Sequence, residues 1–246
     1  MLQQSLDKIL FFDIETAPQV EEYAMLNDEM QHLWAEKTDK LRASSPQKYS
    51  DTATPADLWD QAAIYAEYGR IVCISVGICY MKDKEWHLRT KSFCGTDEKQ
   101  ILIDFFELLG KFMITPYHHL CGHNIKEFDV PYVCRRALVN GVGLPDCLRI
   151  AGKKPWEVQF IDTMELWKFG DYKSFTSLKT LTAIFGIPTP KDDIDGSEVG
   201  RVYYKEKNIN RISVYCQKDV VATTQVFLRL NGENCISKEN IESVTD

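Results

Sequence analysis

The stretch ILFFDIETAP, residues 9–18, joins an apolar run to two carboxylates that are one residue apart. Its first four residues have the pattern of a strand buried on both faces, as in parallel sheets. Because side chains alternate along a strand, Asp13 and Glu15 point to the same side. Two like charges this close raise each other's pKa unless a cation lies between them. The stretch therefore predicts a metal site on a central strand.

Composition indicates a globular protein of one large domain, or of one domain with a sizeable insertion. The 246 residues are 44% hydrophobic and 26% charged, which is enough for a real core. A net charge of −7 argues against a protein that coats nucleic acid by bulk electrostatics. It leaves open an enzyme that grips one strand end locally, with divalent metals supplying the positive charge.

The eight cysteines form no CxxC pair and no Cys/His ligand spacing, which favours a reducing cytoplasm without structural zinc. The N-terminus lacks the pattern of a signal peptide, and no run approaches the length of a membrane span. We therefore expect a cytoplasmic protein that does not bind membranes.

Periodicity and turn residues predict the order of the elements along the chain. A helical insertion, residues 19–67, follows the first strand; its second helix begins at TPAD, residues 54–57, and ends near Gly69. Antiparallel strands at 70–81 and 85–95 come next. Helices follow at 97–113, 129–141, 176–188 and 210–230, strands at 118–124 and 156–167. This order predicts an α/β fold, a mixed central sheet with helices on both faces, in one domain of residues 1–232. The polar tail, residues 233–246, is expected to fray.

The last predicted helix carries an acidic residue on its apolar stripe. Asp219 lies in line with residues that are otherwise apolar or aromatic, Ile212, Tyr215, Ala222, Val226 and Leu230. An inward carboxylate is costly unless it pairs or binds metal, so a buried salt bridge with an arginine is the alternative. Tyr215 is one turn away, so its hydroxyl reaches the same region.

A third acidic residue begins the helix in GHNIKEFDVPYV, residues 122–133. Asp129 stands there with Pro131 in the first turn, and the plain interpretation is a helix N-cap. Asp13 and Glu15 likewise have a plain interpretation, as structural or solvated residues at a strand end.

Together, FFDIET, HNIKEFD and YCQKD resemble, in order, the three motifs of the DEDD 3′–5′ exonuclease superfamily, which has an RNase H-like fold. The Tyr-x-x-x-Asp form of the third motif indicates the tyrosine subclass, DEDDy. The stretches at 177–199 and 212–230 are similar to predicted exonucleases related to the proofreading domain of family-B DNA polymerases. The resemblance covers residues 9–230.

The resemblance implies a role for each matching position. Asp13, Glu15, Asp129 and Asp219 match four metal-binding carboxylates, and Tyr215 matches the residue that orients the attacking water. Such oxygen ligands suit two Mg²⁺ or Mn²⁺ ions, which would activate a water and stabilise the leaving 3′-oxygen. The implied substrate is the 3′ end of single-stranded nucleic acid, DNA ahead of RNA.

Asn124, Phe128 and Lys191 are the candidate substrate-binding residues. Phe128 is equally suited to the core. Lys191 begins an acidic loop, KDDIDGSE, that has the composition of a solvated turn. The basic pairs at 135–136 and 153–154 are typical of solvated faces, although either would also suit a strand backbone.

His123 is expected to pack or hydrogen bond beside the site. Four aromatic residues of the insertion, Trp34, Trp59, Tyr65 and Tyr68, favour packing over base stacking.

Two other functions fit part of this pattern. A haloacid-dehalogenase-like phosphatase also uses a strand-end acid pair followed by Thr, and Thr16 is present. Its second acid is typically Asp and it has no role for a Tyr-x-x-x-Asp helix, so Glu15 and Tyr215 count against it. A non-catalytic RNase H-like module that binds nucleic acid is the other alternative, and the five intact motif residues argue against it.

Overall fold

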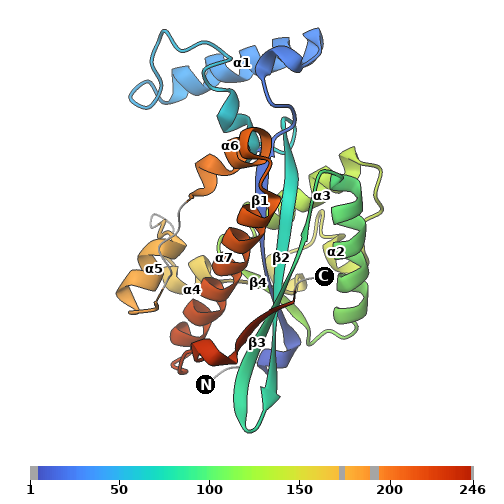
Figure 1. Ribbon diagram of the computed structural model, residues 1–246, viewed down its shortest axis with the longest axis vertical. Helices are drawn as coiled ribbons and strands as arrows, with labels where there is room; N and C mark the ends of the chain where they lie inside the picture. The colour runs from blue at the N-terminus through green and yellow to red at the C-terminus, as the bar shows by residue number, and fades with distance from the viewer. Residues whose placement is uncertain (1–4, 172–174, 189–193, 245–246) are drawn as a thin grey trace.

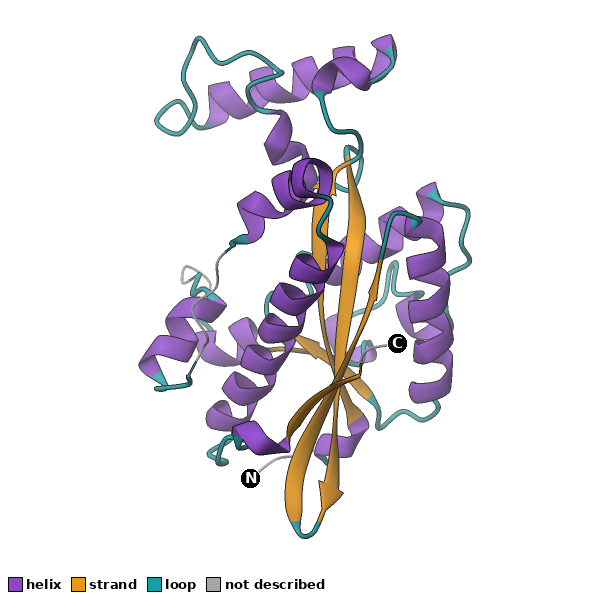
Figure 2. Cartoon of the chain, in the orientation of Figure 1, coloured by secondary structure: helices purple, strands orange, loops and turns teal. Residues whose placement is uncertain are grey.

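A six-stranded mixed sheet forms the centre of the molecule (Figure 1; Figure 2). The computed structural model describes residues 5–171, 175–188 and 194–244. The order across the sheet is β5-β4-β1-β2-β3-β6. The strands are β1 (Ile9–Pro18), β2 (Gly69–Lys82), β3 (Glu85–Cys94), β4 (His119–Gly122), β5 (Phe160–Asp162) and β6 (Ile241–Val244).

The first three strands are antiparallel, whereas β4 and β5 continue from β1 in parallel and β6 lies parallel to β3. The predicted hairpin of residues 70–95 is confirmed. Its turn residues Asp83 and Lys84 have φ angles of 51° and 66°, the backbone geometry that matches the twist of a two-residue hairpin.

Helices cover both faces of the sheet, as predicted (Figure 1). Helices α2 and α3 pack on one face and α7 packs on the other. The helices are α1 (Asp28–Ser44), α2 (Glu98–Phe112), α3 (Asp129–Val139), α4 (Thr163–Lys168), α5 (Leu178–Ile184), α6 (Val199–Arg201), which continues as a π-helical turn (Val202–Glu206), and α7 (Ile209–Leu230). Among the described residues, no helix combines the length and hydrophobicity that crossing a membrane requires.

Strand β1 is buried on both faces, and its alternation decides which core each side chain enters. Phe12 packs against Phe105 of α2, with ring centroids 5.7 Å apart. Phe11 packs against Phe227 of α7, with centroids 5.6 Å apart. Odd-numbered residues of β1 therefore face α7, and this side is the one that Asp13 and Glu15 share.

The insertion after β1 forms a layer of its own beyond the end of the sheet (Figure 1). Helix α1 begins at Asp28, inside the predicted helical insertion, with the Asn27 side chain accepting a hydrogen bond from the Met30 N–H at 2.8 Å. The predicted second helix is wrong: the Thr54–Asp57 hydrogen bonds form, but only a 3-10 helix, Trp59–Ile64, follows.

Tryptophan packing explains this difference. The Trp59 ring meets the buried Trp34 ring edge-on at 5.4 Å, and its indole N–H donates to the Val20 carbonyl at 3.0 Å. These long-range contacts outweigh the local signal for an α-helix. As predicted, the aromatic residues of the insertion pack together.

The strand predicted at 156–167 is too long, because β5 ends at Asp162 and α4 begins at once. The Asp162 carboxylate accepts a hydrogen bond from the Met164 N–H at 3.0 Å. This cap ends the strand by satisfying an N–H group of the new helix.

The polar tail does not fray within the described residues. Its residues Lys238–Asn240 form a 3-10 helix, and β6 joins the sheet beside β3. The buried Gln225 side chain anchors the segment, accepting from the Ile236 N–H at 2.9 Å and donating to the Ile236 carbonyl at 2.7 Å. The tail is ordered because a residue of α7 supplies hydrogen bonds that the tail's own sequence lacks.

A buried ion pair joins α2, α3 and β2. The Glu98 carboxylate accepts from Arg136 at 2.6 and 2.8 Å, from the Ile71 N–H at 2.7 Å and from Asn140 at 2.9 Å. The interpretation of residues 135–136 as a solvated basic pair is therefore wrong for Arg136, whereas Arg135 is exposed. The pair holds α3 in place, and α3 begins at Asp129.

Replacing Arg136 tests this anchor. Arg136→Met should lower the free energy of unfolding by about 3–5 kcal/mol, because it leaves the buried Glu98 charge without its main partner. Arg149→Met is the matched control: its pair with Asp146 is solvent-exposed, so the loss should stay below about 1 kcal/mol. Urea denaturation of both variants measures the difference, and equal losses would contradict the anchoring role.

Candidate active site

Two carboxylates of β1 point toward α7. Glu15 is buried, with 6% of its surface exposed, and Asp13 is half-buried. The β1–β2 register shifts between Glu15 and Thr16, and a bulge of this kind re-aims neighbouring side chains. Both carboxylates lie on the face that carries Phe11 and Ala17, so they meet α7 where its buried stripe passes over β1.

Asp129 reaches the same strand from α3. Its Oδ1 accepts a hydrogen bond from the Ile14 N–H at 3.2 Å. Strand β4 pairs with β1 only from Ile9 to Phe11, so this N–H lies beyond the paired part of that edge. The alternative interpretation of Asp129 as an N-cap is wrong, because Phe128 occupies the N-cap position. Asp129 is 3% exposed and lies against the backbone between Asp13 and Glu15.

Tyr215 and Asp219 come from the α7 stripe that the sequence predicts. Ile212, Ala222 and Val226 of this stripe are buried, and Tyr215 and Asp219 are half-buried between them. A hydrogen bond joins Tyr215 to Asp219, which lies one turn further along the helix. The stripe thus carries a phenol and a carboxylate to the region that Asp13 and Glu15 face.

The four carboxylates act on one another electrostatically. Burial raises the pKa of Asp13 well above its ordinary value, and Asp129, Asp219 and Glu15 raise it further, in that order. Burial, then Asp219 and Asp129, likewise raises the pKa of Glu15. Burial, with smaller effects of Asp162 and Asp219, raises the pKa of Asp129 to about 7. The fold therefore brings residues that lie more than 200 positions apart close enough for their charges to interact.

The donor set of this cluster fits a divalent cation. Among the described residues, no hydrogen bond or ion pair reaches the buried Glu15 carboxylate, and only burial and neighbouring acids act on it. A buried carboxylate in this setting is stabilised by a cation. Asp13, Glu15, Asp129 and Asp219 supply the hard oxygen atoms that Mg²⁺ and Mn²⁺ take as ligands.

Sequence reasoning missed Asp162, which positions the loop before Asp129. This aspartate is 2% exposed, and its two oxygens accept from the N–H groups of Asn124 at 2.9 Å and Lys126 at 3.2 Å. Asn124 has a φ of 64°, a left-handed conformation that Asn tolerates. The sequence does carry a signal for Asp162: this residue ends the apolar run FID, residues 160–162, and directly precedes a helix start.

Gly122 and His123 also shape this loop. A Cβ atom on Gly122 would lie 1.8 Å from Ile125 Cγ2 and 2.9 Å from the Phe12 carbonyl, so the close approach to β1 requires glycine. His123 Nε2 lies 2.9 Å from the Thr176 carbonyl, and Nδ1 lies 2.9 Å from Thr163 Oγ1. His123 thus hydrogen bonds beside the site, as predicted.

The three candidate substrate-binding residues have different settings. Asn124 is half-buried in the loop that Asp162 holds. Phe128 is half-buried and packs against Tyr132, with ring centroids 5.4 Å apart. Lys191 lies outside the described residues, as do Asp192 and Asp193. In the same acidic loop, Asp195 accepts from the Ser197 N–H at 2.8 Å, the capped turn expected there.

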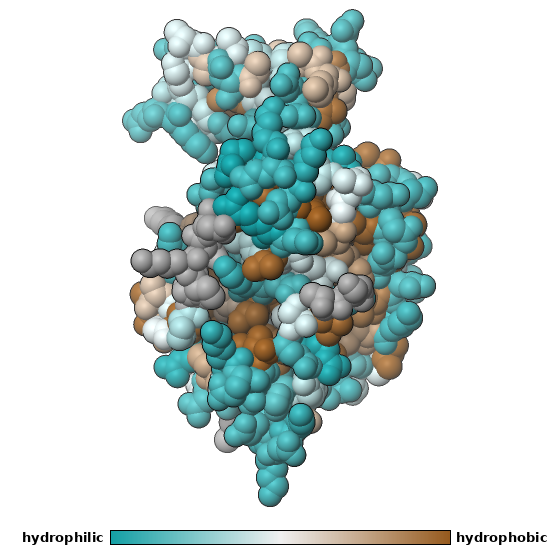
Figure 3. All heavy atoms as spheres, viewed as in Figure 1, coloured by the Kyte–Doolittle hydropathy of each residue, from teal (hydrophilic) through white to brown (hydrophobic). Residues whose placement is uncertain are grey.

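A cavity of about 720 Å³ adjoins the cluster on the side of α7 that faces β6. Figure 3 shows hydrophobic side chains gathered near the middle of this face, and others along its right side. The cavity walls include Val214, Val221, Ile236 and Ile241. Of the five candidate site residues only Asp219 lines it, so the cavity lies beside the carboxylates rather than among them.

Residues 63–243 match a family described as predicted 3′–5′ exonucleases related to the exonuclease domain of PolB. The chain belongs to this family. The matched region contains Asp129, Tyr215 and Asp219, whereas Asp13 and Glu15 precede it. No curated protein matches the chain.

Among solved structures, the chain is similar to the family B DNA polymerase from the hyperthermophilic archaeon Pyrobaculum calidifontis. The match has a TM-score of 0.57 and 16% identity, and it covers 91% of this chain and 24% of that one. At this identity the similarity shows the fold alone. The predicted α/β, RNase H-like fold is confirmed.

The raised pKa of Asp129 predicts how stability depends on pH in the metal-free protein. Between its ordinary value of 3.8 and about 7, the folded state binds more protons at Asp129 than the unfolded state. The contribution of this group to the free energy of unfolding is therefore present at low pH and lost as pH rises through about 7. Asp129→Asn should gain stability relative to the unmodified protein across this window.

Urea denaturation of both proteins with a chelator, in steps from pH 4 to 7, measures this difference. His119 and His123 have pKa values lowered by burial and contribute the opposite slope, but they do so equally in both proteins. A difference that stays constant with pH would contradict the raised pKa.

Proposed function

We propose that this chain is a metal-dependent 3′–5′ exonuclease acting on single-stranded nucleic acid, with DNA as the first candidate substrate and RNA as the second. In the reaction, a water oxygen bonds to the terminal phosphorus as the bond to the 3′-oxygen breaks. The products are a nucleoside 5′-monophosphate and a strand shortened by one residue. The observation that carries this proposal is the gathering of three carboxylates, those of Asp13, Asp129 and Asp219, around the buried and unpaired side chain of Glu15. Membership of a family of predicted 3′–5′ exonucleases supports it.

In this proposal Asp13, Glu15, Asp129 and Asp219 hold two divalent ions, Mg²⁺ or Mn²⁺. When bound, such ions activate a water and stabilise the leaving oxygen in an in-line displacement. The carboxylates themselves are fixed by the fold. Asp13 and Glu15 lie on a strand buried on both faces, and the Ile14 N–H holds Asp129 at 3.2 Å. Rigid elements of this kind suit a reaction that depends on positioning.

Tyr215 is proposed to orient the attacking water. Burial, followed by the charges of Asp219, Glu15 and Asp13, raises the pKa of its phenol, so the hydroxyl keeps its proton at neutral pH. A protonated hydroxyl both donates and accepts a hydrogen bond. The hydroxyl can therefore hold a water while the half-buried ring packs against the apolar cluster that α7 shares with β1 and β2.

Asn124 and Phe128 are proposed substrate contacts. Both belong to the loop that leads into Asp129, and Asp162 fixes that loop through the Asn124 and Lys126 N–H groups. The exposed part of the half-buried Phe128 ring would offer a surface for base stacking. We extend the same proposal to Lys191 as a phosphate contact, on the basis of its charge alone.

Strand digestion tests the activity. Purified protein with Mn²⁺ should degrade a 5′-labelled single strand to a ladder of progressively shorter products and release labelled mononucleotide from a 3′-labelled strand. Chelator should stop both, and Asp13→Asn should reduce the rate at least about 10³-fold, because the metal ligands lose charge. Release of terminal phosphate alone would instead indicate a phosphatase, and an intact, shifted strand would indicate a binding module.

Tyr215→Phe separates water orientation from packing. Single-turnover cleavage with saturating Mn²⁺ should slow by about 10- to 1,000-fold, the range for one lost oriented contact. Mn²⁺ affinity should fall by no more than about 100-fold, because the phenol is hydrogen bonded to the proposed ligand Asp219 without being a ligand itself, and saturating Mn²⁺ removes this effect from the measured rate. Cleavage at the rate of the unmodified protein would assign Tyr215 to packing alone.

A further inference from the structure

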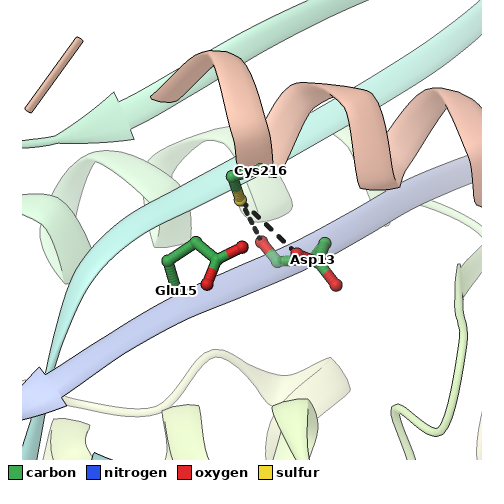
Figure 4. A group of neighbouring side chains, drawn as sticks. All are labelled: Asp13, Glu15 and Cys216. Atoms are coloured by element: carbon green, nitrogen blue, oxygen red, sulfur yellow. Dashed lines mark hydrogen bonds between the residues drawn. The ribbon is translucent and has the colours of Figure 1, made fainter. Parts of the chain in front are cut away.

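A thiol lies between the two carboxylates of β1 (Figure 4). Cys216, on α7, directs its Sγ toward Asp13, 3.4 Å from the Asp13 carbonyl oxygen and 3.6 Å from Oδ2. One ligand atom from each of Asp13, Glu15 and Cys216 lies within 4.8 Å of the other two. Two carboxylate oxygens and one sulfur therefore lie close enough together to hold one metal ion.

The surrounding residues hold this sulfur in place. Cys216 is fully buried, and its thiol hydrogen bonds with Cys73. Cys73 is the β2 partner of Glu15 in the sheet register, and its Sγ lies 3.6 Å from Ser75 Oγ. Cys216 is thus fixed from the side of the sheet while its thiol faces the acids.

The Glu15 side chain supplies the second observation. It is nine-tenths buried, points toward Asp13 and Cys216, and takes part in no hydrogen bond or ion pair among the described residues (Figure 4). A buried carboxylate in this position gains most from a cation. The third donor beside these carboxylates is the Cys216 sulfur, which favours thiophilic cations over hard, oxygen-seeking ones.

We propose that Asp13, Glu15 and Cys216 form a binding site for a thiophilic divalent cation, with Zn²⁺ the fitting ion. Zn²⁺ accepts Cys sulfur at about 2.3 Å and carboxylate oxygen at about 2.0–2.2 Å, which places tetrahedral ligands about 3.5 Å apart. The observed ligand atoms lie within 4.8 Å of one another, so they must approach by about 1 Å to reach that spacing. Mg²⁺ and Mn²⁺ favour oxygen ligands, so the thiol contributes little to their binding.

Zn²⁺ binding involves no oxidation or reduction. The S–H bond of Cys216 breaks, its proton leaves to solvent, and a Zn–S bond forms. The bound Zn²⁺ takes the Asp13 and Glu15 carboxylates, which the Mg²⁺ or Mn²⁺ ions of the proposed reaction also need as ligands. Zn²⁺ is therefore an inhibitor of the nuclease; the inhibition rests on the proposed function, whereas the binding does not.

Spectroscopy and competition test the binding without any activity assay. Cd²⁺ serves as the probe for sulfur ligation through its ultraviolet sulfur-to-metal charge-transfer band, and Zn²⁺ affinity is measured against a chromophoric chelator. Cys235→Ser is the background for every sample, because Cys235 is the exposed thiol of the described chain. Cys79→Ser is the matched control, because Cys79 is an equally buried thiol of β2 that lies outside the ligand set.

Cys216→Ser should abolish the Cd²⁺ band and weaken Zn²⁺ binding at least about tenfold, since even indirect metal partners cost 10- to 100-fold. Its Mn²⁺ affinity should stay within about twofold, because Mn²⁺ favours oxygen donors. Glu15→Gln, a nearly isosteric change, should weaken the binding of both Zn²⁺ and Mn²⁺. It also tests the site if Cys216→Ser does not fold, as judged by its melting transition.

The outcomes separate this site from the nuclease activity. A Cys216-dependent Cd²⁺ band in a protein that degrades no strand would support the thiol site and refute the proposed function. An active nuclease whose Cd²⁺ band and Zn²⁺ affinity survive Cys216→Ser would refute the thiol site alone. Loss of the band in Cys79→Ser but not in Cys216→Ser would also overturn the assignment.

Discussion

The mutual repulsion of four carboxylates at one strand is the constraint on which the site depends. Strand β1 is buried on both faces, so Asp13 and Glu15 cannot turn away to solvent. Asp129 and Asp219 add their charge from two helices on opposite faces of the sheet. The protein tolerates this cluster because large apolar cores flank it on both sides and hold the strand in place. A divalent cation relieves the repulsion and uses the same geometry.

Hydrogen bonds and one buried ion pair aim the carboxylates of the site. The Ile14 N–H holds Asp129, and the Asp162 carboxylate holds the loop that precedes it. The Glu98–Arg136 pair fixes α3 against α2 and β2. Each of these contacts crosses between elements, so the site is as rigid as the packing of the sheet and helices. Such rigidity suits chemistry that relies on preorganised ligands.

Much of the fold follows from local patterns. The two faces of β1, the hairpin of β2 and β3, and the stripe of α7 were all predictable because their periodicity is strong. The helix expected after Thr54, the strand expected over residues 156–167 and the frayed tail were wrong. Distant residues decided two of these outcomes, Trp34 for the insertion and Gln225 for the tail, whereas the local Asp162 cap ended the strand. Segments with weak local preference take the conformation that their neighbours stabilise.

The sequence by itself determined that Asp13 and Glu15 share one side of a buried strand, and that Tyr215 and Asp219 share one stripe of a helix. It did so because both facts depend only on backbone periodicity. The tertiary structure alone decided that Cys216 faces Asp13, and that Asp162 meets the Asn124 and Lys126 N–H groups. These partners lie between 36 and 203 positions apart, and no local pattern relates them. They meet because the crossing of α7 over the sheet, and the parallel pairing of β4 with β5, bring their elements together.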